Sequence, residues 1–211
     1  MSYDNSVSNL NNIFNKIYVI SLISEVNRRN NINKIAKKFN FKFEFIDAVD
    51  YKNLNFQQLK VEKKIAFPGN DFYCTKKCTC HGSGHNIDIK QIACSLSHLK
   101  VWTLIHKNNL KNALILEDDV YFEEGLNDKL QNMEPLISKN WNYINLGRNN
   151  SFKDSKKLIQ KISRGFSGTQ MYGISNMGAQ KAIENFYPVR AHVDGYLDYF
   201  VIQKRWGSAK L

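Results

Sequence analysis

The hydrophobic and polar positions along the chain change repeatedly between the two-residue period of strands and the 3.6-residue period of helices. Residues 16–21 (KIYVIS) are rich in β-formers, and residues 42–46 (KFEFI) alternate strictly. The polar segment 25–39 between them places apolar residues at helical spacing, namely Ile32, Ile35, Ala36 and Phe39. The pattern predicts a βαβ unit, and therefore two parallel strands.

The middle of the chain contains an irregular segment followed by a long helix. Residues 66–88 show neither period and contain Pro68, several glycines and three of the four cysteines, which predicts a loop insertion. Asp88 can cap a helix that reaches about Ile105. The buried face predicted for this helix consists of Ile92, Leu96, Leu99, Trp102 and Ile105.

Residues 113–116 (ALIL) form a short, wholly apolar run that predicts a strand covered on both faces. Further strands are predicted at 143–146 and 168–175. Helices are predicted at 126–137, from Asn176 to Phe186, and from Asp194 onwards. We therefore expect an α/β fold with a mostly parallel sheet flanked by helices, consisting of a flexible tail (1–15) and one domain (16–211) that carries the insertion 66–88.

The composition limits the classes of protein to which the chain can belong. The 211 residues include 43% hydrophobic and 12% aromatic residues, which are globular values. No apolar run approaches the roughly 20 residues that cross a bilayer. The polar start of the sequence lacks the pattern of a secretory leader. We expect no transmembrane segment and a cytoplasmic location, which would be the host cytoplasm for a viral source.

The net charge of +11 favours anionic partners such as nucleic acid, a membrane surface or a phosphorylated small molecule. The lysines are scattered in short pairs along the chain, as on solvated helix faces, which argues against a nucleic-acid stripe. No G-x-G-x-x-G or G-x-x-x-x-G-K-[ST] pattern is present, which argues against a dinucleotide enzyme or a P-loop ATPase.

Glu117, Asp118 and Asp119 follow the buried run directly. Ligand sites in open α/β sheets lie outside the carboxyl ends of the strands, so these acids occupy the expected place for a site. Clustered carboxylates repel one another, and Mg²⁺ or Mn²⁺ relieves this repulsion by taking oxygen ligands from them and from substrate phosphates. A charged, solvated turn is the alternative.

Several ordered motifs resemble glycosyltransferase family 25. They are IYVISL with Arg28 and Arg29 after it, FIDAVD, ACSLSHLKVW, ALILEDDV, YINLG, GTQMYGIS and HVDGYL. The family includes lipooligosaccharide and collagen galactosyltransferases. The resemblance implies a GT-A type fold with a Rossmann-like sheet, a bound Mn²⁺ or Mg²⁺, a UDP-sugar donor and inversion at the anomeric carbon.

The resemblance also implies roles for individual residues. Two of the acids Glu117, Asp118 and Asp119 would hold the metal, namely Asp119 with either Asp118 or Glu117. EDD is not a spaced Asp-x-Asp, so which pair binds the metal stays open. Asp194 would be the base that deprotonates the acceptor hydroxyl, with Asp198 as substitute. Asp194 as a helix cap is the alternative. The acceptor side would include Gly168, Thr169 and Tyr172. The donor pocket would include Ser21, Leu22, Arg28, Arg29, Asp47, Ala48, Asp50, Ser95, Ser97 and His98, together with Glu117 and Asp118.

The insertion contains Cys74, Cys78, Cys80, His81 and His85 in one short stretch. Structural zinc usually has paired ligands separated by a longer spacer, and this spacing is irregular. Zinc held by Cys74, Cys78, Cys80 and His85, one disulfide, or reduced thiols all remain open, and a cytoplasmic location argues against the disulfide.

The function predicted from the sequence is metal-dependent transfer of a hexose from a UDP-sugar to a hydroxyl of a glycan or a collagen-like protein. Two alternatives stay open. The first is a basic module that binds phosphate or RNA through the Cys/His loop, with the acids only structural. The second is a metal-dependent hydrolase of nucleotide sugars, which would need no acceptor pocket.

Overall fold

The computed structural model describes residues 10–65, 88–137, 140–147, 168–189, 191–198 and 200–201. A five-stranded sheet has the order β2-β1-β3-β5-β4. The strands are β1 (Ile17–Ser21), β2 (Glu44–Asp47), β3 (Asn112–Glu117), β4 (Tyr143–Asn145) and β5 (Met171–Ser175). The α-helices are α1 (Leu10–Ile13), α2 (Val26–Lys38), α3 (Phe56–Val61), α4 (Ile89–Lys107), α5 (Leu126–Met133), α6 (Asn176–Phe186) and α7 (Val193–Asp198), and the 3₁₀ helices are η1 (Tyr51–Asn53) and η2 (Glu134–Leu136).

The sheet is mostly parallel, as predicted. β1 pairs in parallel with β2 and β3, and β5 is antiparallel to both β3 and β4, so four of the five strands run in one direction. The carboxyl ends of β2, β1 and β3 therefore lie at one edge of the sheet. Because β5 runs the opposite way, the residues that precede it, Gly168 to Gln170, reach the same edge.

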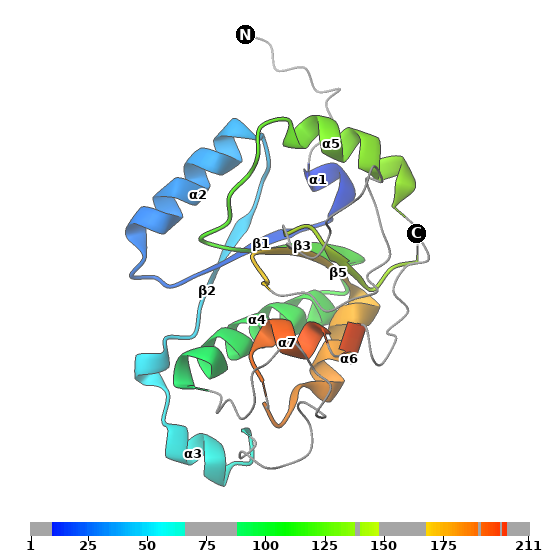
Figure 1. Cartoon of the computed structure of the whole chain (residues 1–211). Coiled ribbons are helices and arrows are strands. Elements are labelled where there is room, and N and C mark those ends of the chain that lie inside the picture. The colour runs from blue at the N-terminus through cyan, green and yellow to red at the C-terminus, as the bar shows by residue number, and fades with distance from the viewer. Residues whose placement is uncertain are drawn as a thin grey trace.

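Two hydrophobic cores lie on opposite faces of the sheet. Alternation along β3 sends Ala113 and Ile115 into the core beneath α4, α6 and α7, whereas Leu114 and Leu116 enter the core beneath α1, α2 and α5. Figure 1 shows the corresponding layers, with α2 and α5 above the sheet and α4, α6 and α7 below it. Both faces of β3 are covered, which explains its wholly apolar sequence.

Helix α4 begins with a complete capping box. The Gln91 backbone N–H donates to the Asp88 side chain over 2.8 Å, and the Asp88 backbone N–H donates to Gln91 Oε1 over 3.0 Å. These bonds satisfy two amide groups that the helix cannot satisfy itself. The predicted cap at Asp88 is confirmed, and the helix continues two residues beyond the predicted end at Ile105, to Lys107.

The flexible tail predicted for residues 1–15 extends too far into the chain, because its last residues are folded. Leu10–Ile13 form helix α1, and Leu10 and Phe14 are each only 1% exposed. A Cβ placed on Gly173 in β5 would lie 2.5 Å from Phe14 Cε1, so the missing side chain gives Phe14 its place against the sheet. Residues 10–15 therefore belong to the folded structure. Neither helix α1 nor helix α3 was predicted from the sequence.

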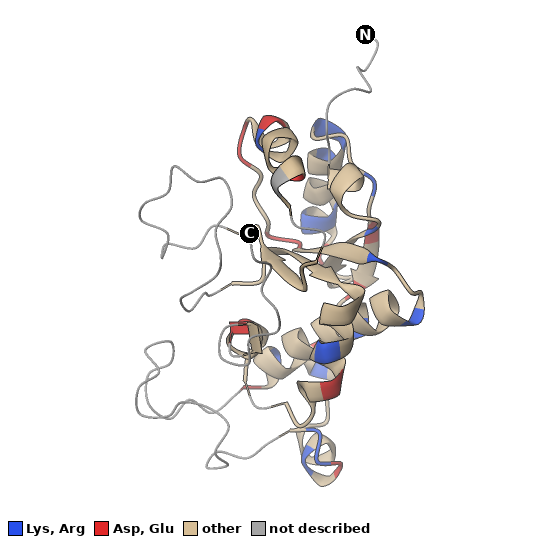
Figure 2. Cartoon of the chain, turned by 90° about the vertical axis from the view of Figure 1, so that its right-hand side faces the viewer, with Lys and Arg blue, Asp and Glu red and all other residues tan. Residues whose placement is uncertain are grey.

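Within the residues that the structure describes, none of the helices combines the length and apolar character needed to cross a bilayer. Figure 2 shows Lys and Arg positions spread over several helices in that view and not gathered on one element.

Candidate functional site at the carboxyl edge of the sheet

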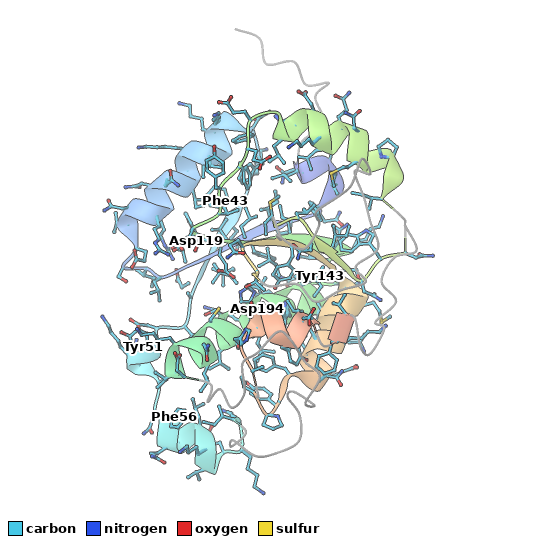
Figure 3. The ribbon with its side chains drawn as sticks, in the orientation of Figure 1. Phe43, Tyr51, Phe56, Asp119, Tyr143 and Asp194 are labelled. Carbon is cyan, nitrogen blue, oxygen red and sulfur yellow. The ribbon has the colours of Figure 1, made fainter. Side chains whose placement is uncertain are left out.

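Side chains predicted to bind the donor meet at the carboxyl edge of the sheet. Ser21 ends β1, Asp47 ends β2 and Glu117 ends β3, and these strands are adjacent. Figure 3 labels Asp119 at this edge and Asp194 at the start of α7. Ligand sites of open α/β sheets occupy this position, so the predicted location of the site agrees with the fold.

Glu117 and Asp118 point to opposite faces of the sheet. Asp118 binds residues of β1 and α2, whereas Glu117 contacts His98 of α4. This separation follows from the two-residue period of an extended chain. The two alternatives predicted for the metal, Asp119 with Asp118 or Asp119 with Glu117, therefore lie on different faces. Among the described residues, Cys94, His98 and Glu117 form a group of three metal-ligating side chains whose ligand atoms lie close together.

Asp118 is held by two partners. Ser21 Oγ donates to Asp118 Oδ2 over 2.7 Å, and the Arg28 guanidinium donates to Asp118 Oδ1 over 3.0 Å. Asp118 is buried, whereas about half of the Arg28 side chain is exposed. The hydrogen bond to Asp118 is the main reason that the pKa of Arg28 is raised. Arg28 therefore extends from the buried Asp118 carboxylate to the solvent at this edge of the sheet.

Asp119 is the exposed carboxylate of the three. Partial burial of its carboxyl group, and then the neighbouring charges of Glu117 and Asp118, raise the pKa of Asp119. The positive charge of Arg28 lowers the pKa of Asp119, but it does not offset the combined effect of burial and the two neighbouring acids. This is the electrostatic condition under which a hard divalent cation binds carboxylates favourably.

Glu117 is fixed by Thr169 and His98. Thr169 Oγ1 donates a short hydrogen bond to Glu117 Oε1, and His98 Nε2 lies 3.3 Å from the same oxygen. Burial alone would raise the pKa of Glu117, but His98 and Thr169 outweigh it and lower the pKa. Burial alone would lower the pKa of His98, but Cys94 and Glu117 raise it to about 9.

His98 is also held from its other nitrogen. His98 Nδ1 is 2.8 Å from the hydroxyl oxygen of Tyr172, which accepts a hydrogen bond from Trp102 Nε1 over 2.9 Å. Tyr172 and His98 have no exposed surface. Tyr172 therefore positions His98 from within the core, and its side chain is buried; its place on the acceptor side stays a prediction.

Arg29 stabilises the strand ends. Its guanidinium donates to the carbonyl oxygens of Ser21 and Leu22 and to Asp47 Oδ1, and it stacks on the Phe45 ring at 4.7 Å. These contacts occupy one face and several N–H groups of the guanidinium. Arg29 ties β1 to β2, and of the two neighbouring arginines Arg28 is the more exposed one.

Ser95 and Ser97 anchor α4, and each is 1% exposed. Ser97 Oγ accepts from the backbone N–H of Val49, next to the predicted donor residue Ala48, and Ser95 Oγ donates to the carbonyl of Ala191. Asp50 accepts from the Lys52 backbone N–H at the start of η1. The buried serines therefore position the loops around the site, and their place in the donor pocket stays a prediction.

Asp194 connects α7 to the segment before β5. Its Oδ2 accepts from the Gly168 backbone N–H over 3.0 Å, and its Oδ1 accepts from the Gly195 backbone N–H over 2.9 Å and contacts His192 Nδ1 closely. About 20% of the Asp194 side chain is exposed. Asp198, the substitute base, is buried and raises the pKa of buried Tyr143 through its charge, after the larger effect of burial.

Cys94 is the site residue that the sequence analysis missed. It lies one helical turn before His98, a spacing that places both side chains on one face of α4. The i, i+4 spacing of a cysteine and a histidine was visible in the sequence, but the third member of the group comes from β3. The predicted zinc ligands Cys74, Cys78, Cys80 and His85, and His81 with them, lie outside the described residues.

The clustered acids, the arginine and the loops from several strands lie at the edge where open α/β proteins bind their ligands. The sequence matches the family described as "Glycosyltransferase family 25 (LPS biosynthesis protein)" over residues 14–197. The chain belongs to glycosyltransferase family 25.

The proteins similar to this chain include some named as galactosyltransferases and some named as inactive. Procollagen galactosyltransferase 2 of Mus musculus is 30% identical over 180 residues, covering 81% of this chain and 27% of that protein. Inactive glycosyltransferase 25 family member 3 of Mus musculus is 28% identical over 210 residues, covering 89% and 34%. A glycosyltransferase 25 family member of Drosophila melanogaster is 28% identical over 180 residues, covering 80% and 27%. The chain thus spans about a third or less of their lengths.

Proposed function

We propose that this chain transfers a hexose, such as galactose, glucose or N-acetylglucosamine, from a UDP-sugar to a hydroxyl group of a glycan or a collagen-like protein, with inversion and with Mn²⁺ or Mg²⁺. One observation carries the proposal. Asp119 stands exposed beside Asp118, which Ser21 and Arg28 hold in place, at the edge of the sheet where ligands bind.

The acids fit a cation of the proposed kind. Mg²⁺ is usually held by one or two carboxylates together with substrate phosphates, so Asp119, with Asp118 beside it, supplies enough protein ligands. Burial, and then the charges of Glu117 and Asp118, raise the pKa of Asp119, and the same neighbouring charges favour a cation at this position. The cation would neutralise charge that develops on the departing diphosphate.

Arg28 is suited to the same diphosphate. One guanidinium nitrogen donates to Asp118, and about half of the side chain remains in contact with solvent. Guanidinium groups bind phosphate oxygens through several N–H groups at once. Donors directed at the leaving oxygens stabilise the transition state more than the ground state, because negative charge grows there as the bond to the sugar breaks.

Asp194 is the proposed base for the acceptor hydroxyl. Inverting displacement requires a group that takes the proton from the attacking oxygen, and a positioned carboxylate can accept it. The backbone N–H groups of Gly168 and Gly195 hold the Asp194 carboxylate, and part of it reaches solvent. Burial of Asp198 disfavours it for this role, because an acceptor in solution would not reach it.

The test is release of UDP from each common UDP-sugar in the presence of Mn²⁺, with and without a panel of glycan and hydroxylysine-containing acceptors. We expect acceptor-dependent release that EDTA abolishes and that Asp119→Asn reduces by at least about 100-fold. Glu44→Gln is the matched control, since Glu44 is an exposed acid at the opposite, amino end of β2 and pairs with Lys16 there.

Three results would each favour a different function for this chain. Release that ignores the acceptor would favour a nucleotide-sugar hydrolase. UDP binding by calorimetry without any release would place this chain with relatives described as inactive. Salt-sensitive RNA binding without UDP binding would favour the basic binding module and contradict the transferase.

A further inference from the structure

The group formed by Cys94, His98 and Glu117 lies on the α4 face of the sheet edge, opposite to the face on which Ser21 and Arg28 hold Asp118. The thiol, the imidazole and the carboxylate each offer one ligand atom, and these three atoms lie within 4.8 Å of one another. Glu117 reaches the group because its side chain points to the α4 face, opposite to Asp118. The described part of the chain brings two helix residues and one strand residue together here.

His98 Nε2 is buried and points into this group, towards the Glu117 carboxylate. His98 is 0% exposed, and its Nε2 is a buried polar atom with no hydrogen-bonding partner among the described residues. It lies 3.3 Å from Glu117 Oε1, at ion-pair distance but without hydrogen-bond geometry. A buried polar atom in this condition costs free energy unless a partner satisfies it.

The spacing suits tetrahedral metal coordination. With metal distances of about 2.0 to 2.1 Å to nitrogen and oxygen, two ligand atoms at the tetrahedral angle lie roughly 3.3 Å apart. The observed separation of His98 Nε2 and Glu117 Oε1 is 3.3 Å. Cys94 is exposed, so the fourth position would open towards solvent.

The surrounding residues orient the ligands. Tyr172 lies against His98 Nδ1 and accepts from Trp102, and Thr169 donates to Glu117. Metal-binding histidines are commonly fixed through the second ring nitrogen, and metal-binding carboxylates through hydrogen bonds. The imidazole and the carboxylate are thus held in place before a metal arrives.

We propose that Cys94, His98 and Glu117 form a three-ligand site for a thiophilic divalent cation, of which Zn²⁺ fits best, distinct from the hard cation proposed at Asp119. A thiolate with an imidazole and one carboxylate is a donor set that selects zinc over magnesium or manganese. The site does not depend on the proposed sugar transfer.

The test uses Co²⁺ as a spectroscopic substitute for Zn²⁺ in the full chain, because a cobalt–thiolate bond gives a charge-transfer absorption band. The variant Cys74→Ser/Cys78→Ser/Cys80→Ser removes the other three cysteines of the sequence and leaves Cys94. We expect this variant to bind about one equivalent of Co²⁺ with the thiolate band, and Zn²⁺ to displace it. Absence of the band would overturn the proposal.

Substitutions of the ligands complete the test. In the triple-variant background, Cys94→Ser should abolish the band, and Cys94→Ser and Glu117→Gln should each weaken Zn²⁺ binding at least about 10-fold by competition with a chromogenic chelator. Near-UV circular dichroism checks that each variant is folded. Asp119→Asn should leave Zn²⁺ binding unchanged, which separates this site from the donor edge. Zn²⁺ affinities that differ by less than about 2-fold between Cys94→Ser and its parent would contradict the assignment.

Discussion

Ser21 Oγ and Asp118 Oδ2 are 2.7 Å apart although 97 residues separate them in the sequence. This hydrogen bond joins the carboxyl end of β1 to the residue that follows β3. Arg28 of α2 donates a second hydrogen bond to the same carboxylate. The edge of the sheet is therefore cross-linked by side chains before any ligand binds, and each contact can be removed separately.

Asp118→Ala should destabilise the fold by about 1 to 3 kcal/mol, because it removes the short hydrogen bond of the buried Ser21 hydroxyl and the closer of the two ion pairs of Arg28. Urea denaturation monitored by circular dichroism gives the difference in free energy of unfolding. Asp119→Ala is the matched control, since Asp119 is exposed and its loss should change stability by less than about 0.5 kcal/mol. Equal effects of the two substitutions would contradict this account.

Asp194→Asn should lower kcat by about 10²- to 10⁴-fold and leave the KM for the donor nearly unchanged, because the amide keeps an acceptor oxygen but cannot take a proton. Steady-state kinetics with saturating acceptor gives both constants. His192→Gln tests the contact that His192 Nδ1 makes with Asp194 and should shift the acid limb of the pH profile of kcat. A normal kcat in Asp194→Asn would remove Asp194 as the base.

Gly173→Ala should destabilise the protein by about 1 to 3 kcal/mol, because the new methyl group would lie 2.5 Å from Phe14 Cε1 and 3.3 Å from Trp141. A double-mutant cycle with Phe14→Leu should show coupling, since the smaller side chain makes room. Gly147→Ala is the comparison: its Cβ would approach no atom closer than 3.4 Å, so the cost should be smaller. Strict additivity in the cycle would refute the contact.

The buried phenols of Tyr18 and Tyr143 predict loss of stability at alkaline pH. Burial raises the pKa of both groups above 10.0. The native chain then retains protons that the unfolded chain releases, so their stabilising contribution is fully present below about pH 10 and decreases as pH rises towards the native pKa values. The slope is up to about 1.4 kcal/mol per pH unit for each tyrosine.

Urea denaturation at about pH 8 and about pH 11 measures this decrease. Tyr18→Phe should reduce it, because phenylalanine keeps the ring and has no proton to lose. An unchanged pH dependence in Tyr18→Phe would show that the phenol of Tyr18 does not contribute.

Periodicity predicted the strands and the main helices because their burial follows local sequence. The apolar run of β3 and the cap at Asp88 are such local signals, and both predictions are confirmed. The acids were correctly located at the edge of the sheet. Alternation along β3 also implies that Glu117 and Asp118 face opposite ways, so the strand period distinguishes the two predicted ligand pairs.

Contacts between distant segments could not be predicted in this way. The partners of Glu117 come from α4 and from the segment before β5, 52 residues away in the case of Thr169. The burial of Tyr172 depends on Trp102, and the anchoring role of Arg29 depends on Phe45 and Asp47. Tertiary packing decides these contacts, and no local pattern in the sequence encodes them.

The reciprocal bonds of Asp88 and Gln91 make the start of α4 self-sufficient. The donors and acceptors of both bonds lie within four consecutive residues, so the signal that starts the helix is local. The helix that carries Cys94 and His98 is thereby fixed from its first turn, and the framework of the site inherits that starting point.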